Sequence, residues 1–225
     1  MMNQDAKQKL AFISGEGDCW YDRNSHLNID ERIANDLILK EIDRLKLNAG
    51  SCLEIGCAEG WRLAEIARRY DINCFGIDPS KKAIEQGRVN FSELKLEQGT
   101  ADELPYESES MSIVIVGFCL YLCDRNELFK IANEIDRVLS ENGILIVLDF
   151  YSEQSYKNEY THLNGINSYK MDYSKMFTWN PNYQLISKTI TDHDNRSIVV
   201  DKNERIALCS LRKATKDAYS EKPEY

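Results

Sequence analysis

Residues 51–60 have the sequence SCLEIGCAEG, in which a short apolar run ends at a loop of small residues. Apolar side chains recur at helical spacing before this stretch, over residues 29–47, and again after it, over residues 61–70. A buried strand between two amphipathic helices is typical of a parallel sheet that helices cover on both faces. The stretch therefore predicts a strand, an open loop and a helix in succession.

The same alternation of strands and helices continues along the chain. Further strands are predicted at residues 74–77, 94–98, 111–117 and 144–148, and further helices at residues 80–91 and 126–139. Two more predicted strands, residues 183–191 and 205–211, flank a turn-rich segment as in a long hairpin. We therefore expect an α/β, Rossmann-like, doubly wound fold, with a mostly parallel seven-stranded sheet and an antiparallel strand in a C-terminal hairpin.

The composition is acidic: Lys plus Arg number 28 and Asp plus Glu 37, for a net charge of −9. Such a surface repels nucleic-acid phosphates and anionic lipids, so we expect neither nucleic acid nor a membrane as a partner. The first residues are polar, and the longest nearly apolar run, residues 111–123, is shorter than the roughly 20 residues that cross a bilayer. Seven cysteines, several of them in apolar runs, indicate reduced thiols and a cytoplasmic location.

The loop at residues 54–60 follows the first strand, where doubly wound sheets bind their ligands. A dinucleotide fingerprint needs a small sixth residue, but the sixth residue counted from Gly56 is Trp61. The Gly-Lys-Ser/Thr tripeptide of a phosphate-binding loop is absent from the chain. Glu54 would repel a diphosphate and instead suits a ligand that carries positive charge. A plain strand-to-helix turn is the alternative.

Asp78 ends the second predicted strand, 24 residues after Glu54. A carboxylate at that place can accept hydrogen bonds from both hydroxyls of a ribose. It can also act as the N-terminal charge of the following helix, which the helix dipole favours. Together the two carboxylates indicate a nucleoside with a cationic end, and S-adenosylmethionine has both features. No spacing of ligands in the sequence indicates a metal site.

Four motifs resemble those of the class I S-adenosylmethionine-dependent methyltransferases and occur in the same order. Residues 53–60, LEIGCAEG, are similar to the family's acidic-x-Gly-x-Gly-x-Gly motif, with Ala58 in place of the middle glycine. Residues 76–80 (GIDPS) resemble the family's second motif. Residues 100–105 (TADELP) resemble the segment that contacts the adenine, and residues 137–143 (RVLSENG) resemble a turn motif late in the domain. In the last of these Asn142 replaces a glycine, a change that suits turn geometry.

The resemblance implies a contact for each part of the cofactor. At the methionine end, Gly56 and Ala58 allow close backbone approach, and Glu54 lies beside the amino group. Phe118 and Tyr121 flank the methyl group, and many relatives carry histidine at the place of Tyr121. At the nucleoside the implied residues are Asp78 for the ribose, Pro79 beside the adenine, Asp102 as acceptor from the adenine amino group, and Ala101 through its backbone amide.

Residues 15–24, GEGDCWYDRN, resemble the N-terminal lid of several small-molecule methyltransferases. In that role Trp20 would exclude water from the cofactor, and Arg23 would hold the cofactor carboxylate through two hydrogen bonds. The alternative is a helix that packs on the edge of the sheet, with Trp20 as an ordinary core residue.

A hydroxyl or ammonium acceptor must lose a proton, and the candidate bases are Tyr121, Asp149 and His162. His162 follows the fifth strand, where this fold commonly builds its acceptor pocket. Residues 151–183 are rich in Tyr, Lys and Asn, and this mixture of polar groups and aromatic faces suits a polar small molecule such as a sugar. The same stretch is compatible with a solvated cap that carries a dimer contact.

We therefore expect one methyltransferase domain of residues 1–225 with four segments: an N-terminal lid (1–28), a cofactor-binding core (29–149), an acceptor-site insertion (150–182) and a C-terminal hairpin (183–212). The predicted reaction moves a methyl group from S-adenosylmethionine to an oxygen or nitrogen of a polar small molecule, for example a modified sugar or a surface-polysaccharide precursor. The alternatives are an RNA- or protein-directed methyltransferase and a non-catalytic S-adenosylmethionine-binding subunit. The chain is expected to be a monomer or a homodimer.

Overall fold

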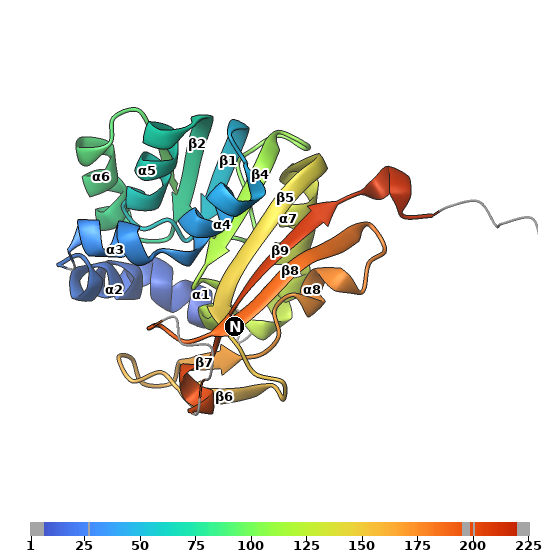
Figure 1. The fold of residues 1–225 in the computed structure, drawn as a ribbon. Coiled ribbons are helices and arrows are strands. Elements are labelled where there is room, and N and C mark those ends of the chain that lie inside the picture. Colours follow the sequence, from blue (N-terminus) through green and yellow to red (C-terminus); the bar gives the residue numbers. More distant parts are fainter. Residues whose placement is uncertain (1–6, 27, 195–198, 200, 220–225) are drawn as a thin grey trace, which may run out of the picture.

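A seven-stranded sheet forms the centre of the protein (Figure 1), whose computed structural model describes residues 7–26, 28–194, 199 and 201–219. The strand order is β3-β2-β1-β4-β5-β9-β8. The strands of this sheet are β1 (Ala49–Ile55), β2 (Asp71–Asp78), β3 (Lys95–Gln98), β4 (Met111–Gly117), β5 (Leu139–Phe150), β8 (Tyr183–Thr191) and β9 (Ile206–Lys213). Neighbouring strands are parallel except where β9 runs antiparallel to both β5 and β8. The predicted fold class is therefore confirmed.

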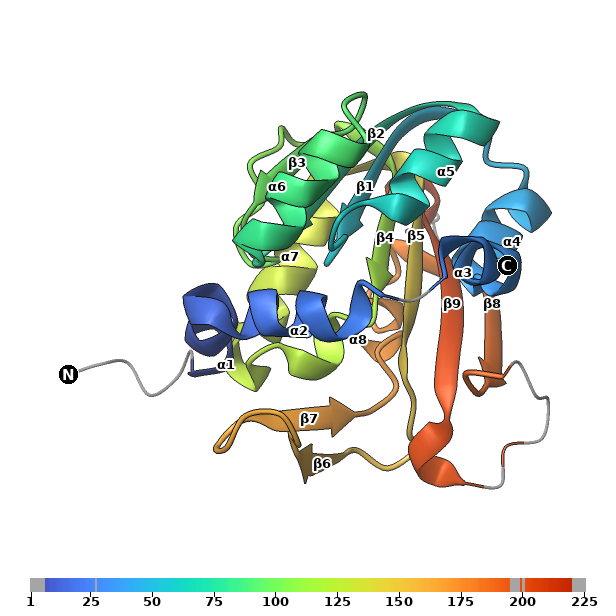
Figure 2. The ribbon, with the colours of Figure 1, turned by 90° about the vertical axis from the view of Figure 1, so that its left-hand side faces the viewer.

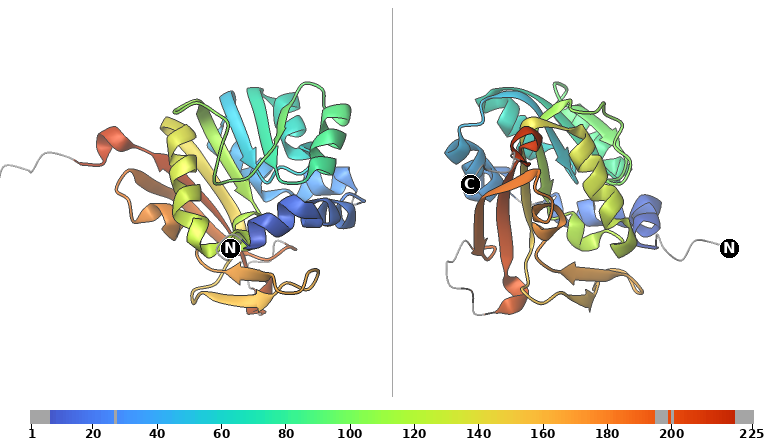
Figure 3. Two further views of the ribbon diagram at one scale, coloured as in Figure 1. Left: turned by 180° about the vertical axis from the view of Figure 1, so that it is seen from behind. Right: turned by 90° about the vertical axis from the view of Figure 1, so that its right-hand side faces the viewer.

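Helices cover both faces of this sheet. The helices on one face are α4 (Leu37–Leu45), α5 (Trp61–Arg69) and α6 (Lys81–Asn90), and those on the other are α7 (Leu128–Val138) and α8 (Lys175–Thr178). Figure 3 shows α7 in front of the sheet when the molecule is seen from behind. Successive residues of β1 serve the two cores in turn: Cys52 packs with the first group of helices, and Leu53 with the second. This alternation explains why the central strands are apolar throughout.

The helix predicted over residues 29–47 is in fact two helices, α3 (Ile29–Asn35) and α4. The break lies at Asp36, whose backbone is extended and whose carboxylate accepts a hydrogen bond from the amide of Leu39 at 2.8 Å. An aspartate that caps the next helix in this way competes with helical continuation. Apolar periodicity alone does not reveal such a break, because the stripe continues across it.

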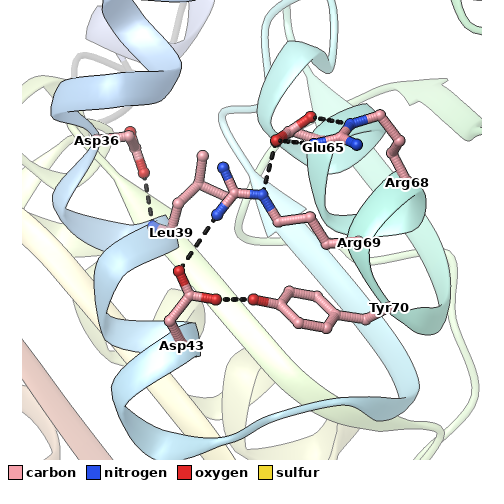
Figure 4. A network of polar contacts seen from close by, with 7 residues as sticks. All are labelled: Asp36, Leu39, Asp43, Glu65, Arg68, Arg69 and Tyr70. Atoms are coloured by element: carbon pink, nitrogen blue, oxygen red, sulfur yellow. Dashed lines mark hydrogen bonds and ion pairs between the residues drawn. The ribbon is translucent and has the colours of Figure 1, made fainter.

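Polar contacts join α4 to α5 (Figure 4). Asp43 on α4 accepts hydrogen bonds from Tyr70 and from Arg69, the latter at 3.2 Å. Arg69 in turn donates to Glu65 at 2.6 Å, and Arg68 donates to the same carboxylate. The network joins the last turns of α4 and α5.

The N-terminal segment crosses the carboxyl edge of the sheet. Its described part comprises α1 (Lys7–Ala11), a π-helical turn η2 (Phe12–Glu16) and α2 (Gly17–Asn24). In Figure 2 the arrowheads of β1 and β4 point toward these helices. Residues 1–6 and 27 of the predicted lid segment lie outside the described residues.

Residues 150–182 contain a two-stranded hairpin, β6 (Tyr156–Glu159) and β7 (Asn167–Lys170), followed by α8. The hairpin lies against the N-terminal segment: the amide of Asn167 donates to Gln8 at 3.2 Å, and the rings of Phe12 and Tyr160 are 6.2 Å apart. The predicted C-terminal hairpin is formed by β8 and β9, and residues 195–198 and 200 of its connection lie outside the described residues.

All seven cysteines lie in the described residues and are free thiols, four of them buried. Within the described residues, no helix combines the length and the apolar character that crossing a membrane requires.

Candidate functional site

Two adjoining cavities lie at the carboxyl edge of the sheet, beneath the N-terminal segment. The first cavity is lined by residues that include Phe12, Asp78, Pro79, Ala101, Asp102 and Ile131. The second cavity is lined by residues that include Arg32, Glu54, Ala58, Tyr121, Phe150 and His193. Trp20, Gly56, Gly117 and Phe118 line both cavities and therefore mark the junction between them.

The loop after β1 presents its backbone to this junction. Gly56, Ala58 and Gly60 all have positive φ, of 77°, 49° and 84°. A Cβ atom added at Gly56 would lie 3.1 Å from the Cβ of Cys119, so even a methyl group there is tight. Both the positive φ and the lack of space for a side chain therefore favour glycine at position 56. Ala58 has a Cβ atom, so the left-handed conformation costs it conformational free energy.

Asp78 holds this loop in place from the end of β2. Its carboxylate accepts hydrogen bonds from the amides of Ala58 and Ser80, both at 2.8 Å. Burial raises the pKa of Asp78 to about 6, although both hydrogen bonds act in the opposite direction. Each carboxylate oxygen has a further lone pair, so the group can accept donors from the first cavity as well.

Glu54, near the end of β1, is 1% exposed and forms an ion pair with Arg62 through Oε1. Its other oxygen, Oε2, is buried with no hydrogen-bond partner among the described residues. Burial raises the pKa of Glu54 to about 7, against the opposing effect of Arg62. A buried acceptor without a donor costs about 1–3 kcal/mol, so a cationic donor in the second cavity would be strongly favoured.

Asp102 lines the first cavity but is already bound by two lysines. Its Oδ2 lies 2.5 Å from the Nζ of Lys9 on α1 and 2.9 Å from the Nζ of Lys130 on α7. Burial acts to raise the pKa of Asp102, but the hydrogen bonds from the two lysines hold it well below its usual range. The carboxylate of Asp124 also accepts from the amide of Lys9, at 2.9 Å, which anchors the start of α1. Neither lysine could be predicted from the sequence, because both contacts span more than 25 residues.

The N-terminal helix α2 is fixed over the sheet edge by Asp18, which accepts hydrogen bonds from the hydroxyl of Ser80 at 2.6 Å and the amide of Lys82 at 3.0 Å. Trp20 on this helix lines both cavities. Arg23 lines neither: it donates to Glu16 at 2.5 Å and to the hydroxyl of Tyr160 at 3.0 Å. The structure therefore does not bring Arg23 to the place where the sequence put it.

Arg32 on α3 is the arginine that does line the second cavity together with Arg62. It donates to the carbonyl of Asn24 at 2.5 Å and lies 5.8 Å from the ring centre of Trp61. Burial lowers the pKa of Arg32. Its position could not be read from the sequence, because the turn between α2 and α3 decides which way α3 runs.

Of the three candidate bases, only Tyr121 lines a cavity. Burial and the nearby Asp149 raise the pKa of the Tyr121 hydroxyl well above its usual range, which makes it a hydrogen-bond donor rather than a base. Asp149 is 2% exposed and lines neither cavity; it accepts from the amides of Phe150 at 2.7 Å and Tyr121 at 3.3 Å. It therefore supports the turn that carries Tyr121. Burial raises the pKa of Asp149 to about 7.

His162 is exposed in the turn between β6 and β7, 5.2 Å from the ring of Tyr160, and lines neither cavity. The histidine in the second cavity is His193, which follows β8. The sequence places this histidine in the turn-rich segment between two predicted strands and does not assign it to the site. Only the sheet order, which places the end of β8 two strands from β5, reveals its position.

The residues around these cavities belong to a stretch that is similar to known proteins. The sequence model of a methyltransferase domain family matches residues 53–147. These residues run from the middle of β1 into β5 and include the Gly56 loop, Asp78 and Asp102. Residues 53–147 therefore match a methyltransferase domain, which supports the class I S-adenosylmethionine-dependent family that the four sequence motifs resemble.

Two relatives are about 30% identical to this chain over the stretch that aligns with it. A ubiquinone/menaquinone biosynthesis C-methyltransferase of Campylobacter jejuni is 31% identical over 105 residues, which cover 43% of this chain and 43% of the relative. An ajmaline N-methyltransferase of Rauvolfia serpentina is 30% identical over 118 residues, which cover 47% of this chain and 40% of the relative. The chain thus spans less than half the length of either relative.

Solved structures share the fold at lower identity. A protein of Pyrococcus horikoshii superposes with a TM-score of 0.64 at 15% identity, covering 86% of this chain and 98% of that protein. A [4+2]-cyclase superposes with a TM-score of 0.62 at 16% identity, covering 80% and 81%. The fold of the methyltransferase domain therefore also occurs in a protein named for a different reaction.

The family of this domain implies S-adenosylmethionine as the cofactor. Three features of the cavities fit that molecule. The unpartnered Oε2 of Glu54 suits an ammonium group, and the carboxylate of Asp78 suits a pair of hydroxyls. The space at Gly56, which a side chain would fill, lies between these two carboxylates at the junction.

Proposed function

We propose that the chain is an S-adenosylmethionine-dependent methyltransferase whose acceptor is a small molecule bound in the second cavity. One observation supports this most strongly: Glu54, which lines the second cavity, has a buried carboxylate oxygen with no hydrogen-bond partner among the described residues, and this cavity meets the one lined by Asp78 at Gly56. Most buried carboxylate oxygens are hydrogen-bonded. A cationic ligand would supply the donor that this oxygen lacks.

In this proposal, the two cavities bind different parts of the cofactor. In the first cavity, Asp78 accepts from the ribose hydroxyls, while Phe12, Pro79 and Ile131 supply apolar walls for the adenine. In the second cavity Glu54 holds the amino group. The cofactor supplies a methyl group already activated on a sulfonium, so the chain needs to orient the acceptor and exclude water. Such positioning can account for roughly 7–11 kcal/mol of the barrier.

The walls of the second cavity favour a small acceptor with a flat face. Its aromatic lining residues are Trp20, Tyr21, Trp61, Phe118, Tyr121, Phe150 and His193. Aromatic faces bind flat rings and the apolar faces of sugars alike, so a modified sugar is one proposed acceptor and an unsaturated ring is another. By their names, one relative methylates carbon and the other nitrogen. For this chain we propose oxygen or nitrogen as the methylated atom. The net charge of −9 opposes RNA as the acceptor.

Calorimetric titration with S-adenosylmethionine and S-adenosylhomocysteine tests the proposal, with NADH as a comparison ligand. We expect micromolar binding of both sulfur compounds and at least tenfold weaker binding by Glu54→Gln. Glu85→Gln is the matched control, since Glu85 lies exposed on α6 and forms an ion pair with Lys81 at 3.7 Å. Release of S-adenosylhomocysteine in an acceptor screen then measures turnover. Tight binding of NADH without binding of either sulfur compound would overturn the proposal.

A non-catalytic cofactor-binding protein is the second candidate, and the [4+2]-cyclase of the same fold supports keeping it. It predicts the same binding of S-adenosylmethionine, but no methylated product with any acceptor that occupies the second cavity. A screen that yields a methylated product excludes it.

A further inference from the structure

His193 forms part of the wall of the second cavity close to the junction with the first. Its imidazole stacks on the ring of Phe118, with ring centres 5.3 Å apart and an interplanar angle of 26°, and it meets the edge of Phe150 at 5.5 Å. Phe118 itself lines both cavities and has a positive φ of 49°. The two aromatic rings therefore hold the imidazole beside the point where the cavities meet.

The nitrogens of this imidazole are available to a ligand. Among the described residues, the contacts of His193 are these two ring contacts, and no hydrogen bond occupies either nitrogen. The residue is exposed at the mouth of the second cavity, so a proton taken up there can pass to water. The other two histidines, His26 and His162, line neither cavity.

The carboxylates around the second cavity are engaged elsewhere. Glu59 accepts from the hydroxyl of Tyr21 at 2.6 Å. Asp36 accepts from both Nε and Nη2 of Arg62, at 3.0 and 2.9 Å. Both carboxylates are therefore already engaged by donors of the protein.

The remaining titratable groups of this cavity are equally unsuited. Glu54 forms an ion pair with Arg62 and, in the proposed function, binds the cofactor. Tyr21, Cys57 and Tyr121 keep their protons, because burial raises the pKa of the thiol and of the two hydroxyls. His193 is left as the group at the second cavity that can accept a proton from a bound acceptor.

We propose that His193 is the catalytic base of the methyl transfer. This rests on the proposed function. As the bond between the acceptor oxygen or nitrogen and the methyl carbon forms, the carbon–sulfur bond breaks and its electron pair stays on the sulfur of the product, S-adenosylhomocysteine. A ring nitrogen of His193 takes the proton that the acceptor loses and passes it to water, so atoms and charge balance. The acceptor therefore carries an O–H or N–H group on the side that faces Phe118.

The first test compares His193→Ala with His162→Ala and with His26→Ala, the matched control on the surface. Tritiated S-adenosylmethionine is offered with 4-hydroxybenzoate and aniline, and rates are measured on whichever of these the wild type methylates. We expect His193→Ala to lower kcat by 100-fold or more, while the Kd for S-adenosylhomocysteine changes less than twofold. Added imidazole should restore at least tenfold of the lost rate. Full activity of His193→Ala, or a loss that imidazole does not restore, overturns the proposal, as does a loss on His162→Ala in its place.

The second test needs no acceptor. The chain contains three histidines, so the ring signals of a ¹³C-histidine-labelled protein can be assigned with the three alanine variants. Addition of S-adenosylmethionine should move the His193 signal and leave those of His26 and His162 in place. If calorimetry records binding while the His193 signal stays unmoved, His193 is not at the methyl group and the inference is wrong. If S-adenosylmethionine does not bind at all, the proposed function fails instead, which separates the two outcomes.

Discussion

The carboxylate of Asp78 accepts a hydrogen bond from the backbone amide of Ala58, with 2.8 Å between oxygen and nitrogen. This contact joins the end of β2 to the loop that leaves β1. The amide of Ser80 donates to the other oxygen of Asp78 at the same distance. One side chain therefore orders the loop, holds Ser80 at the start of α6 and lines the first cavity.

Replacement of Asp78 should impair both binding and folding. For Asp78→Ala we expect at least tenfold weaker binding of S-adenosylhomocysteine, because hydrogen bonds to a charged acceptor are worth about 1.5–3 kcal/mol. The free energy of unfolding should also fall by about 1–3 kcal/mol, since two amides lose their acceptor. Calorimetry and urea denaturation measure the two effects. Asp71→Ala, at the exposed opposite end of β2, is the control and should change neither. Unaltered affinity in Asp78→Ala would refute the ribose assignment.

Ala58→Gly should leave the protein equally stable or stabilise it by up to about 1 kcal/mol. The φ of Ala58 is 49°, a conformation that costs an L-residue roughly 1–2 kcal/mol, whereas glycine loses about 0.5–1 kcal/mol through its freer unfolded chain. Urea denaturation at constant pH measures the difference. Ala64→Gly, within α5, provides the contrast and should destabilise by about 1 kcal/mol. Equal destabilisation by both changes would show that Ala58 is unstrained.

Cofactor affinity should rise with pH through the titration of Glu54. Burial raises the pKa of Glu54 to about 7, so the carboxylate is largely protonated at pH 6 and largely ionised at pH 8. If the ionised form binds the amino group, S-adenosylhomocysteine should bind about tenfold more tightly at pH 8 than at pH 6. Glu54→Gln should remove this dependence. So should 5′-methylthioadenosine, which lacks the amino-acid end, and a Glu54-dependent pH effect on its binding would contradict the assignment.

The same group should influence folding stability with the opposite sign. The folded pKa of Glu54, about 7, lies above the ordinary value of 4.5, so the folded state binds the proton more tightly than the unfolded state. Its contribution to the free energy of unfolding is therefore present at low pH and is lost as the pH rises from about 4.5 to about 7. Urea denaturation of wild type and Glu54→Gln across this range measures it. The difference between the two should shift in favour of Glu54→Gln as the pH rises; a constant difference would mean that Glu54 is already ionised at the low end.

Arg23→Met should destabilise the fold and leave cofactor affinity within about twofold. Arg23 donates to Glu16, which is 7% exposed, and both contact Tyr160. Loss of the guanidinium leaves a buried carboxylate with one donor fewer, at a cost of about 1–3 kcal/mol. Calorimetry with S-adenosylhomocysteine and urea denaturation separate the two effects. A large loss of affinity without a loss of stability would support the carboxylate-binding role that the sequence indicated for Arg23.

The parts of the candidate site that depend on neighbours along the chain could be predicted from the sequence. A strand, a loop of small residues and a helix follow from residues 51–70 alone, and a carboxylate at the end of the next strand must lie at the same edge of a parallel sheet. For this reason Glu54, Gly56 and Asp78 all line the cavities. Asn142 illustrates the same point: it has a positive φ of 63°, a conformation that asparagine tolerates, as its place in the turn motif indicated.

The position of a side chain could not be predicted from the sequence where more than one partner is within its reach. Arg23 and Arg32 both lie near the N-terminal helices, and nothing local tells which one turns toward the second cavity and which toward Glu16. His162 and His193 pose the same problem, because each lies in a polar connection between strands. Asp102 carries the residue type that its motif requires, yet its partners Lys9 and Lys130 belong to α1 and α7.

By itself, then, the sequence determined the alternation of strands and helices, the open loop and the carboxylates that follow β1 and β2, because these depend on periodicity and on neighbours along the chain. The tertiary structure alone decided that His193 and Phe118, 75 residues apart in sequence (193 − 118), stack beside one cavity. It also decided that Lys9 binds Asp102. The physical reason is that such contacts depend on the order of the strands and the packing of their connections, and no segment read alone contains that information.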